Sequence, residues 1–198
     1  MNKWCISLIL VAVLMAAAGC QPGLQVSSGP SGWLTYTNSK LGYQVQYSPD
    51  WTYYEFPDRG TGASFSPKTT PAGTKHIIIM VDAVIPPEEY NGQNIAAMSF
   101  EEYVRIAAIV EIQGFEKLVS IEKVEAQGVT GYVTTWEYQP ILSATGEKKL
   151  ELSLPFAYFE LNRTVEGRTY RALQIRLEDA AYRADFDRLV RTMRLTGP

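Results

Sequence analysis

Alternating apolar and polar residues mark the clearest strand of the chain, Tyr43 to Tyr47. Tyrosine or valine occupies every second position and glutamine the positions between, a period typical of a strand with one buried face. A second run, His76 to Ile85, is apolar and β-branched, which predicts a central strand covered on both faces. Strands are also predicted at Trp33–Asn38, Thr52–Phe56, Ala63–Ser66, Lys117–Glu125, Tyr132–Tyr138, Leu150–Leu161 and Thr169–Leu177.

Two stretches show the period of a helix. Ser99 to Gln113 opens with a capping box, in which Ser99 and Glu102 satisfy backbone N–H groups that a helix start leaves unpaired. A second helix closes the chain, with its apolar stripe at Tyr182, Phe186, Leu189, Val190 and Met193. Strands joined mostly by hairpins, with two separated helices, predict an α+β fold: a central, largely antiparallel β-sheet flanked by helices.

The N-terminus has the pattern of a signal peptide. Lys3 precedes an apolar run from Ile6 to Ala18, which is shorter than the roughly 20 apolar residues of a membrane span. The run ends in AAGC, which resembles the bacterial lipobox, so we expect Cys20 to be acylated and residues 1–19 to be removed. The alternative is an ordinary signal peptide cleaved near Ala18, with Cys20 left as a free thiol.

The residues after Cys20 divide into a tether and a domain. Residues 20–32 are rich in Gly, Pro and Ser, a composition typical of a flexible tether. Residues 33–198 have the length of one domain with a real core. We therefore expect a protein anchored by lipid to the extracytoplasmic face of a bacterial membrane.

Composition removes several kinds of chemistry. With only Cys5, Cys20 and one histidine, His76, zinc, haem and thiol-redox sites lack most of their ligands. No Gly-x-Ser-x-Gly motif accompanies the histidine, so a serine hydrolase is not indicated. The formal net charge of −3 gives no basic footprint for nucleic acid.

Charge is distributed unevenly along the chain. Eight of the ten arginines fall between Arg163 and Arg194, whereas Asp82 to Glu125 is acidic. The simpler interpretation is the solvated faces of a strand and a helix. The alternative is a basic face that meets anionic lipid headgroups or an acidic partner.

Three aromatic residues form one candidate binding face. Tyr132, Trp136 and Tyr138 share one face of a predicted strand by parity. Aromatic side chains favour half-buried sheets, so the face either packs beneath a helix or, if it is open, binds a ligand or a partner.

Three carboxylates form the other candidate. Asp82, Glu88 and Glu89 lie in or after a predicted strand and offer the hard oxygen ligands that calcium or manganese prefers. No EF-hand spacing supports such a site. We otherwise expect no cofactor.

The stretch YTNSKLGYQVQYSPDW, Tyr36 to Trp51, resembles the opening of the PsbP-like family, which includes the extrinsic PsbP subunit of photosystem II and many bacterial lipoproteins. Gly42, Tyr43 and Trp51 fall at the family's spacing, with Tyr47 on the same strand face as Tyr43, and we expect all four in the core. The family's proline usually stands where Ser48 is, one place before Pro49. The closing strand and helix, Tyr170 to Leu195, are similar too. The resemblance implies an α/β/α sandwich and no catalytic residue.

These observations predict a membrane-anchored, non-catalytic binding or assembly module with a protein partner in an envelope or membrane complex. A solute- or metal-binding module that uses the acidic loop is the second hypothesis, and a carboxylate-based enzyme is the third. A concave pocket with converging carboxylates favours the second or third, whereas a flat aromatic face favours the first.

Overall fold

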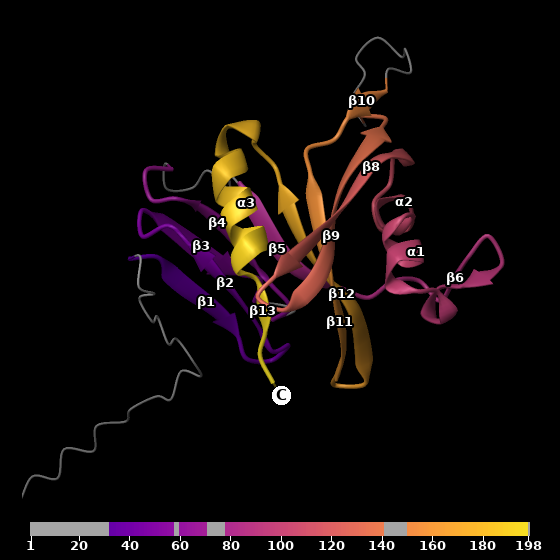
Figure 1. Ribbon diagram of the computed structural model, residues 1–198, viewed down its shortest axis with the longest axis horizontal. Helices are drawn as coiled ribbons and strands as arrows, with labels where there is room; N and C mark the ends of the chain where they lie inside the picture. The colour runs from indigo at the N-terminus through magenta and orange to yellow at the C-terminus, as the bar shows by residue number, and fades with distance from the viewer. Residues whose placement is uncertain (1–31, 58–59, 71–77, 141–149, 198) are drawn as a thin grey trace, which may run out of the picture.

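Antiparallel strands make up most of the protein, and helices are few. Figure 1 shows the computed structural model, in which residues 32–57, 60–70, 78–140 and 150–197 are described. Cys20, the rest of the predicted signal peptide and tether up to residue 31, and His76 lie outside these residues. None of the helices in the described ranges has the length and hydropathy that a membrane span needs.

The strands and helices follow one another along the chain with short connections. The strands are β1 Leu34–Asn38, β2 Tyr43–Tyr47, β3 Trp51–Glu55, β4 Ala63–Pro67, β5 Ile79–Val84, β6 Glu89–Tyr90, β7 Gln93–Asn94, β8 Phe115–Ala126, β9 Val129–Tyr138, β10 Glu151–Leu152, β11 Phe156–Val165, β12 Arg168–Leu177 and β13 Arg194–Leu195. The helical segments are η1 Ile95–Ala97, α1 Phe100–Val104, α2 Ala107–Glu111, η2 Ala180–Tyr182 and α3 Arg183–Thr192.

The strands form one large sheet and two small ones. The large sheet has the order β10-β9-β11-β12-β5-β4-β3, and β8 pairs along the length of β9. A second sheet has the order β1-β2-β13, and β6 and β7 form a separate hairpin. Every pairing is antiparallel. The predicted antiparallel sheet is therefore confirmed.

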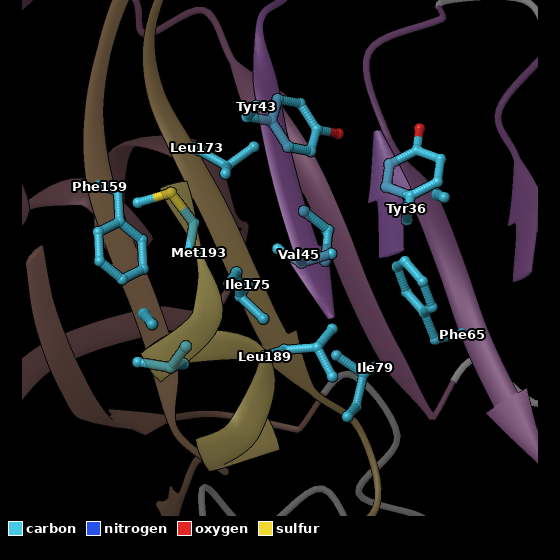
Figure 2. Close-up of a cluster of buried hydrophobic side chains, with 14 of the residues drawn as sticks. Tyr36, Tyr43, Val45, Phe65, Ile79, Phe159, Leu173, Ile175, Leu189 and Met193 are labelled. Carbon is cyan, nitrogen blue, oxygen red and sulfur yellow. The ribbon is translucent and has the colours of Figure 1, made fainter. Parts of the chain in front are cut away.

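Alternate residues of the large sheet divide the interior into two apolar clusters. On β12, Leu173 and Ile175 belong to the first cluster, together with residues of β2, β4, β5 and α3. Figure 2 shows Val45 of β2, Leu189 of α3 and Met193, which directly follows α3, among these side chains. Ala172 belongs to the second cluster, whose helical residues come from α1 and α2.

The opening motif lies in the first cluster, as predicted. Tyr43, Tyr47 and Trp51 are buried, and the Trp51 ring meets the Tyr182 ring edge-on with centroids 5.3 Å apart. Gly42 has a φ of +65°, and a Cβ there would lie 2.7 Å from the Thr196 carbonyl oxygen. Only glycine tolerates both conditions at once.

The predicted helix Ser99 to Gln113 is wrong in its length. Its capping box is present, because the Ser99 side chain accepts from the Glu102 N–H and the Glu102 side chain from the Ser99 N–H. The helix ends at Val104, and the Ile106 N–H bonds to the Tyr103 carbonyl three residues back. This tighter turn separates α1 from α2.

Three further differences from the expected elements have local causes. The predicted strand Leu150–Leu161 divides at Pro155 into β10 and β11, because proline cannot donate a ladder hydrogen bond. The β6–β7 hairpin turns at Asn91 and Gly92, both with positive φ, a common hairpin signal. β13 is too short to show a period and exists because it pairs with β2.

The strand predicted from His76 to Ile85 is central, because β5 pairs with both β12 and β4. The expectation that both of its faces are covered is wrong. Ile79, Val81 and Ala83 are buried, but Met80 and Val84 on the opposite face are only half-buried. That second face of β5 forms part of a cleft.

Candidate functional site

The predicted aromatic face is closed at Trp136, whereas Tyr132 and Tyr138 are half-buried. Trp136 is fully buried in the second cluster, and its Nε1 donates to the Thr134 hydroxyl at 2.8 Å. Tyr132 donates to the Glu101 carboxylate on α1 at 3.3 Å, and Tyr138 stacks on Phe115 with ring centroids 5.3 Å apart. The alternative of an open binding face is therefore wrong for Trp136, because α1 and α2 pack over this part of the sheet.

The predicted acidic metal site does not form. Asp82 lies on β5, whereas Glu88 and Glu89 are exposed at the start of the β6–β7 hairpin. Among the described residues, no three His, Cys, Asp or Glu side chains are placed to hold a metal ion together. The strand direction explains this, because β5 presents Asp82 on the sheet face while Pro86 and Pro87 carry the chain away from it.

A cleft of about 590 Å³ lies where α2 ends over the large sheet. Its lining comes from β5, β12 and the end of α2. The polar lining is Thr61, Asp82, Glu111, Arg168, Gln174 and Arg176, and the remaining lining residues are Met80, Ala83, Val84, Ile85, Ile112 and Tyr170. Both signs of charge and several apolar side chains therefore meet in one concave surface.

The register of β5 and β12 brings these side chains together. Gln174 lies opposite Asp82, and Arg176 opposite Met80, so each pair has Cβ atoms about 5 Å apart on one face. Within the described residues, the second cluster contains side chains of β9, β11 and β12 but none of β3, β4 or β5. The cleft is the part of the sheet face that α1 and α2 leave uncovered.

Glu111, the last residue of α2, is the centre of a hydrogen-bond network at the cleft wall. The Tyr103 hydroxyl donates to its Oε1. The Gln174 Nε2 donates to its Oε2 at 3.0 Å and to the Tyr158 hydroxyl at 2.9 Å. This network joins the α1–α2 segment to β11 and β12.

Burial sets the protonation of the network. Removal from water raises the pKa of the Glu111 carboxyl to about 7, against the opposing effects of the Tyr103 hydrogen bond, the Arg176 charge and the Gln174 hydrogen bond. Burial also raises the pKa of the Tyr103 and Tyr158 hydroxyls well above their usual range, and the nearby Glu111 charge adds to this. Near neutral pH, Glu111 therefore changes charge while both tyrosines remain protonated.

Two arginines of β12, Arg171 and Arg176, contact the residues around this network. Arg171 is 7% exposed; its guanidinium donates to the carbonyls of Ile95 and Met98 and lies 4.9 Å from the centroid of the Tyr103 ring. It reaches these carbonyls beside a register shift between β11 and β12, an irregularity that can redirect a side chain. Arg171 thereby fixes the segment that leads into α1.

Arg176 belongs to the cleft itself. Its Nη2 lies 3.1 Å from the Glu178 carboxylate and 3.6 Å from the Met80 sulfur. Its Nε is buried and has no hydrogen-bond partner among the described residues. Arg176 therefore brings a positive charge to the cleft and carries one buried N–H that no described residue satisfies.

Sequence reasoning missed Glu111, Gln174 and Arg176. One signal was present, because an acidic residue in the last turn of a helix opposes the helix dipole and needs another reason to be there. Gln174 and Arg176 gave a weaker signal, because they are the polar positions that alternate with Leu173, Ile175 and Leu177.

Comparison with known proteins concerns the fold. No protein-family model matches the sequence, and no curated protein matches it. The solved structure of cyanobacterial PsbP (CyanoP) from Synechocystis sp. PCC 6803 is similar over 88% of this chain and 98% of that chain, with a TM-score of 0.42 and 14% identity. A protein from Bacteroides thetaiotaomicron VPI-5482 is similar over 82% of this chain and 48% of that chain, with a TM-score of 0.30 and 10% identity. The first of these two structures bears the name of the family that the opening motif of this chain resembles.

Proposed function

We propose that this chain is a lipid-anchored, extracytoplasmic and non-catalytic binding module that takes a small organic solute into the cleft beside Glu111. The observation that carries the proposal is the cleft itself. Its volume of about 590 Å³ falls in the range of roughly 300–1,000 Å³ that small-molecule sites occupy. Its lining combines apolar side chains with charged and amide side chains, which can contact the body of a solute and fix its orientation.

The chemistry of the lining indicates the class of solute. Arg168 and Arg176 lie toward the two ends of the β12 part of the cleft, and a guanidinium group suits a carboxylate or phosphate. Met80, Val84 and Ile112 supply apolar contacts. A solute with an anionic group and an apolar body matches this pattern better than a bare metal ion, because no three His, Cys, Asp or Glu side chains among the described residues are placed to hold a metal together.

The same geometry ranks the other functions below binding. An assembly role that uses the aromatic face of β9 is less suited, because Trp136, the central aromatic residue of that face, is buried. An enzyme that uses Glu111 as acid or base is less suited, because Tyr103 and Gln174 already occupy both carboxylate oxygens. A protein partner in the envelope remains part of the proposal as the recipient of the solute.

Anchoring and the finer architecture are part of the same proposal. The lipobox-like AAGC ending at Cys20 and the short tether after it support a lipid anchor. An α/β/α sandwich is supported by the division of the interior into a cluster with α3 and a cluster with α1 and α2.

Filling the cleft tests the binding proposal. Val84→Trp places an indole in the cleft from β5, and Tyr54→Trp is the matched control on β3, where the native side chain is 62% exposed. The probes are small carboxylates and organophosphates with apolar bodies, and the readouts are thermal shift and titration calorimetry. We expect wild type and the control to bind one class of probe and Val84→Trp to lose it. Equal binding by the wild type and both variants, or binding by none of the three proteins, contradicts the proposal.

The anchor has a separate test. Cys20→Ala should release the protein from the membrane fraction and abolish metabolic labelling with a fatty acid. Membrane association that survives this substitution unchanged contradicts a lipid anchor at Cys20.

A further inference from the structure

A second hollow, of about 520 Å³, lies between α3, β2 and the turn that joins β8 to β9. It shares no residue with the cleft beside Glu111. Apart from Ala184, every side chain that lines it is polar: Gln46, Gln127, Asp187, Arg188, Arg191 and Thr192. A hollow with this lining suits a charged or strongly hydrogen-bonding group rather than an apolar one.

The balance of charge in the hollow is positive. Two guanidinium groups, those of Arg188 and Arg191, share it with one carboxylate, that of Asp187. Asp187 is already paired with Arg183, one turn earlier on α3, with Nε and Oδ1 2.8 Å apart. At the end of β8, beside the β8–β9 turn, Glu125 is paired with Lys123 at 3.5 Å, so this pair adds no net charge.

The arginine-rich part of the sequence therefore divides into two groups with different environments. Arg163 donates to the Thr196 carbonyl at 2.8 Å, and Arg171 donates to the carbonyls of Ile95 and Met98 inside the fold. These side chains serve the fold itself. Arg191 on α3 is exposed, whereas the half-buried Arg188 lines the hollow beside it and donates to the Gln46 side-chain oxygen at 3.3 Å.

The hollow lies where the chain enters the fold. The guanidinium carbon of Arg188 lies 4.6 Å from the centroid of the Trp33 ring, and Trp33 directly precedes β1. Residues 21–32 connect this point to Cys20, and a linker of that length reaches about 17–21 Å on average. A lipid on Cys20 would therefore hold the α3 side of the protein close to the headgroups.

We propose that the Arg188–Arg191 hollow binds the phosphate of an anionic phospholipid headgroup and orients α3 toward the membrane; this rests on the lipid anchor proposed for Cys20. A guanidinium group holds a phosphate through two parallel hydrogen bonds, and two such groups lie in one hollow of suitable size. Trp33 adds an aromatic ring of the kind that favours the boundary between headgroups and acyl chains. The lipid on Cys20 then holds the protein at the membrane, and the anionic phospholipids around it set the protein's orientation.

The test uses the acylated full-length protein in nanodiscs. One set of discs contains phosphatidylcholine alone and the other a mixture with phosphatidylglycerol, and hydrogen exchange of the α3 amides is measured in both. We expect slower exchange in α3 and the β8–β9 turn only in the anionic discs, with the difference lost in Arg188→Gln/Arg191→Gln. The expected effect is about fivefold for each arginine removed. Raising the ionic strength should weaken the protection in wild type.

The control removes two positive charges elsewhere. Arg105→Gln/Lys117→Gln alters two exposed side chains outside the hollow and should keep the lipid-dependent protection. Exchange in the rest of the sheet reports whether each variant is folded. Equal protection in the two kinds of disc, or protection lost equally in both double variants, overturns the headgroup site.

Two further outcomes separate this inference from the anchor. Failure of the wild-type protein to insert into either disc overturns the anchor and the headgroup site together, whereas insertion without dependence on phosphatidylglycerol overturns the headgroup site alone. Inorganic phosphate added to phosphatidylcholine discs distinguishes the source of the anion. Full protection by phosphate alone would assign the hollow to a free anion and overturn the lipid proposal.

Discussion

The two apolar clusters on opposite faces of the large sheet differ in what they contain. The first consists of aromatic and aliphatic side chains from both larger sheets and α3. The second, under α1 and α2, lies against a buried arginine, a buried glutamine and a carboxyl whose pKa is raised to about 7. A buried polar network costs stability unless every member is paired. The first cluster therefore provides most of the stability of the fold. The second contributes less stability because of its buried polar groups, and it is the region where a ligand can be recognised.

The largest effect should come from the first cluster. Phe65 contacts the rings of Tyr36, Tyr47 and Tyr53 and is fully buried, so Phe65→Ala removes a large buried ring and leaves a cavity. We expect a loss of about 4 kcal/mol in the free energy of unfolding, measured by urea denaturation. Tyr54→Ala, at an exposed position of the neighbouring strand, should cost less than about 1 kcal/mol. Similar losses of stability in the two variants would contradict the role of the first cluster as the main source of stability.

The second cluster depends on Arg171. Arg171→Met keeps an apolar side chain against Tyr103 but leaves the Ile95 and Met98 carbonyls without their charged donor. We expect a loss of about 3 kcal/mol and faster hydrogen exchange confined to the segment from Ile95 to Glu111. Exchange that instead increases throughout the sheet would show that the two clusters are not separable.

The pH dependence of stability should distinguish the clusters next. The folded state raises the pKa of Glu111 from 4.5 to about 7, so it binds more protons than the unfolded state between these values. This contribution therefore makes the protein most stable below pH 4.5, and stability falls as pH rises toward 7, by up to about 3 kcal/mol.

Glu111→Gln cannot ionise and should remove this slope, which chemical denaturation at a series of pH values can measure. Phe65→Ala is the matched comparison, because it lowers stability without changing how stability depends on pH in this range. A slope that persists unchanged in Glu111→Gln would assign the titration to another group.

The smallest effect is expected on the outer face of α1. Arg105 pairs with Glu101 at 2.6 Å, and both side chains are about half exposed. Arg105→Ala should change the free energy of unfolding by no more than about 0.5 kcal/mol, and the change should shrink further in high salt. A loss approaching that of Arg171→Met would mean that the outer and inner faces of α1 contribute alike.

Much of the fold could be predicted from local patterns. The bounds of β2 and the Ser99–Glu102 capping box depend only on neighbours in the sequence, and both were predicted. The break at Ile106 and the strand β13 depend on which surface the chain packs against, and periodicity carries no information about that.

The candidate site was harder to predict for the same reason. Glu111 and Gln174 are 63 residues apart, and their contact depends on where α2 docks across the sheet. The cleft arises because α1 and α2 cover only part of one face, a consequence of helix length and placement. The parity of Tyr132 and Trp136 was correct, but parity alone does not say whether a helix covers that face.

The strand β13 is needed to complete the sheet that contains β1 and β2. Arg194 and Leu195 pair with Gln44 and Tyr43. The three-stranded sheet that contains β1 and β2 is therefore completed only by β13, which follows α3 in the sequence. During synthesis, β2 keeps one unpaired edge until β13 is available, and an open edge is a place where another chain can add. A chain cut just before Arg194 would retain every fully buried side chain of the two clusters and lose only the partly buried Leu195. It would still expose that edge, so its first failure should be self-association rather than unfolding.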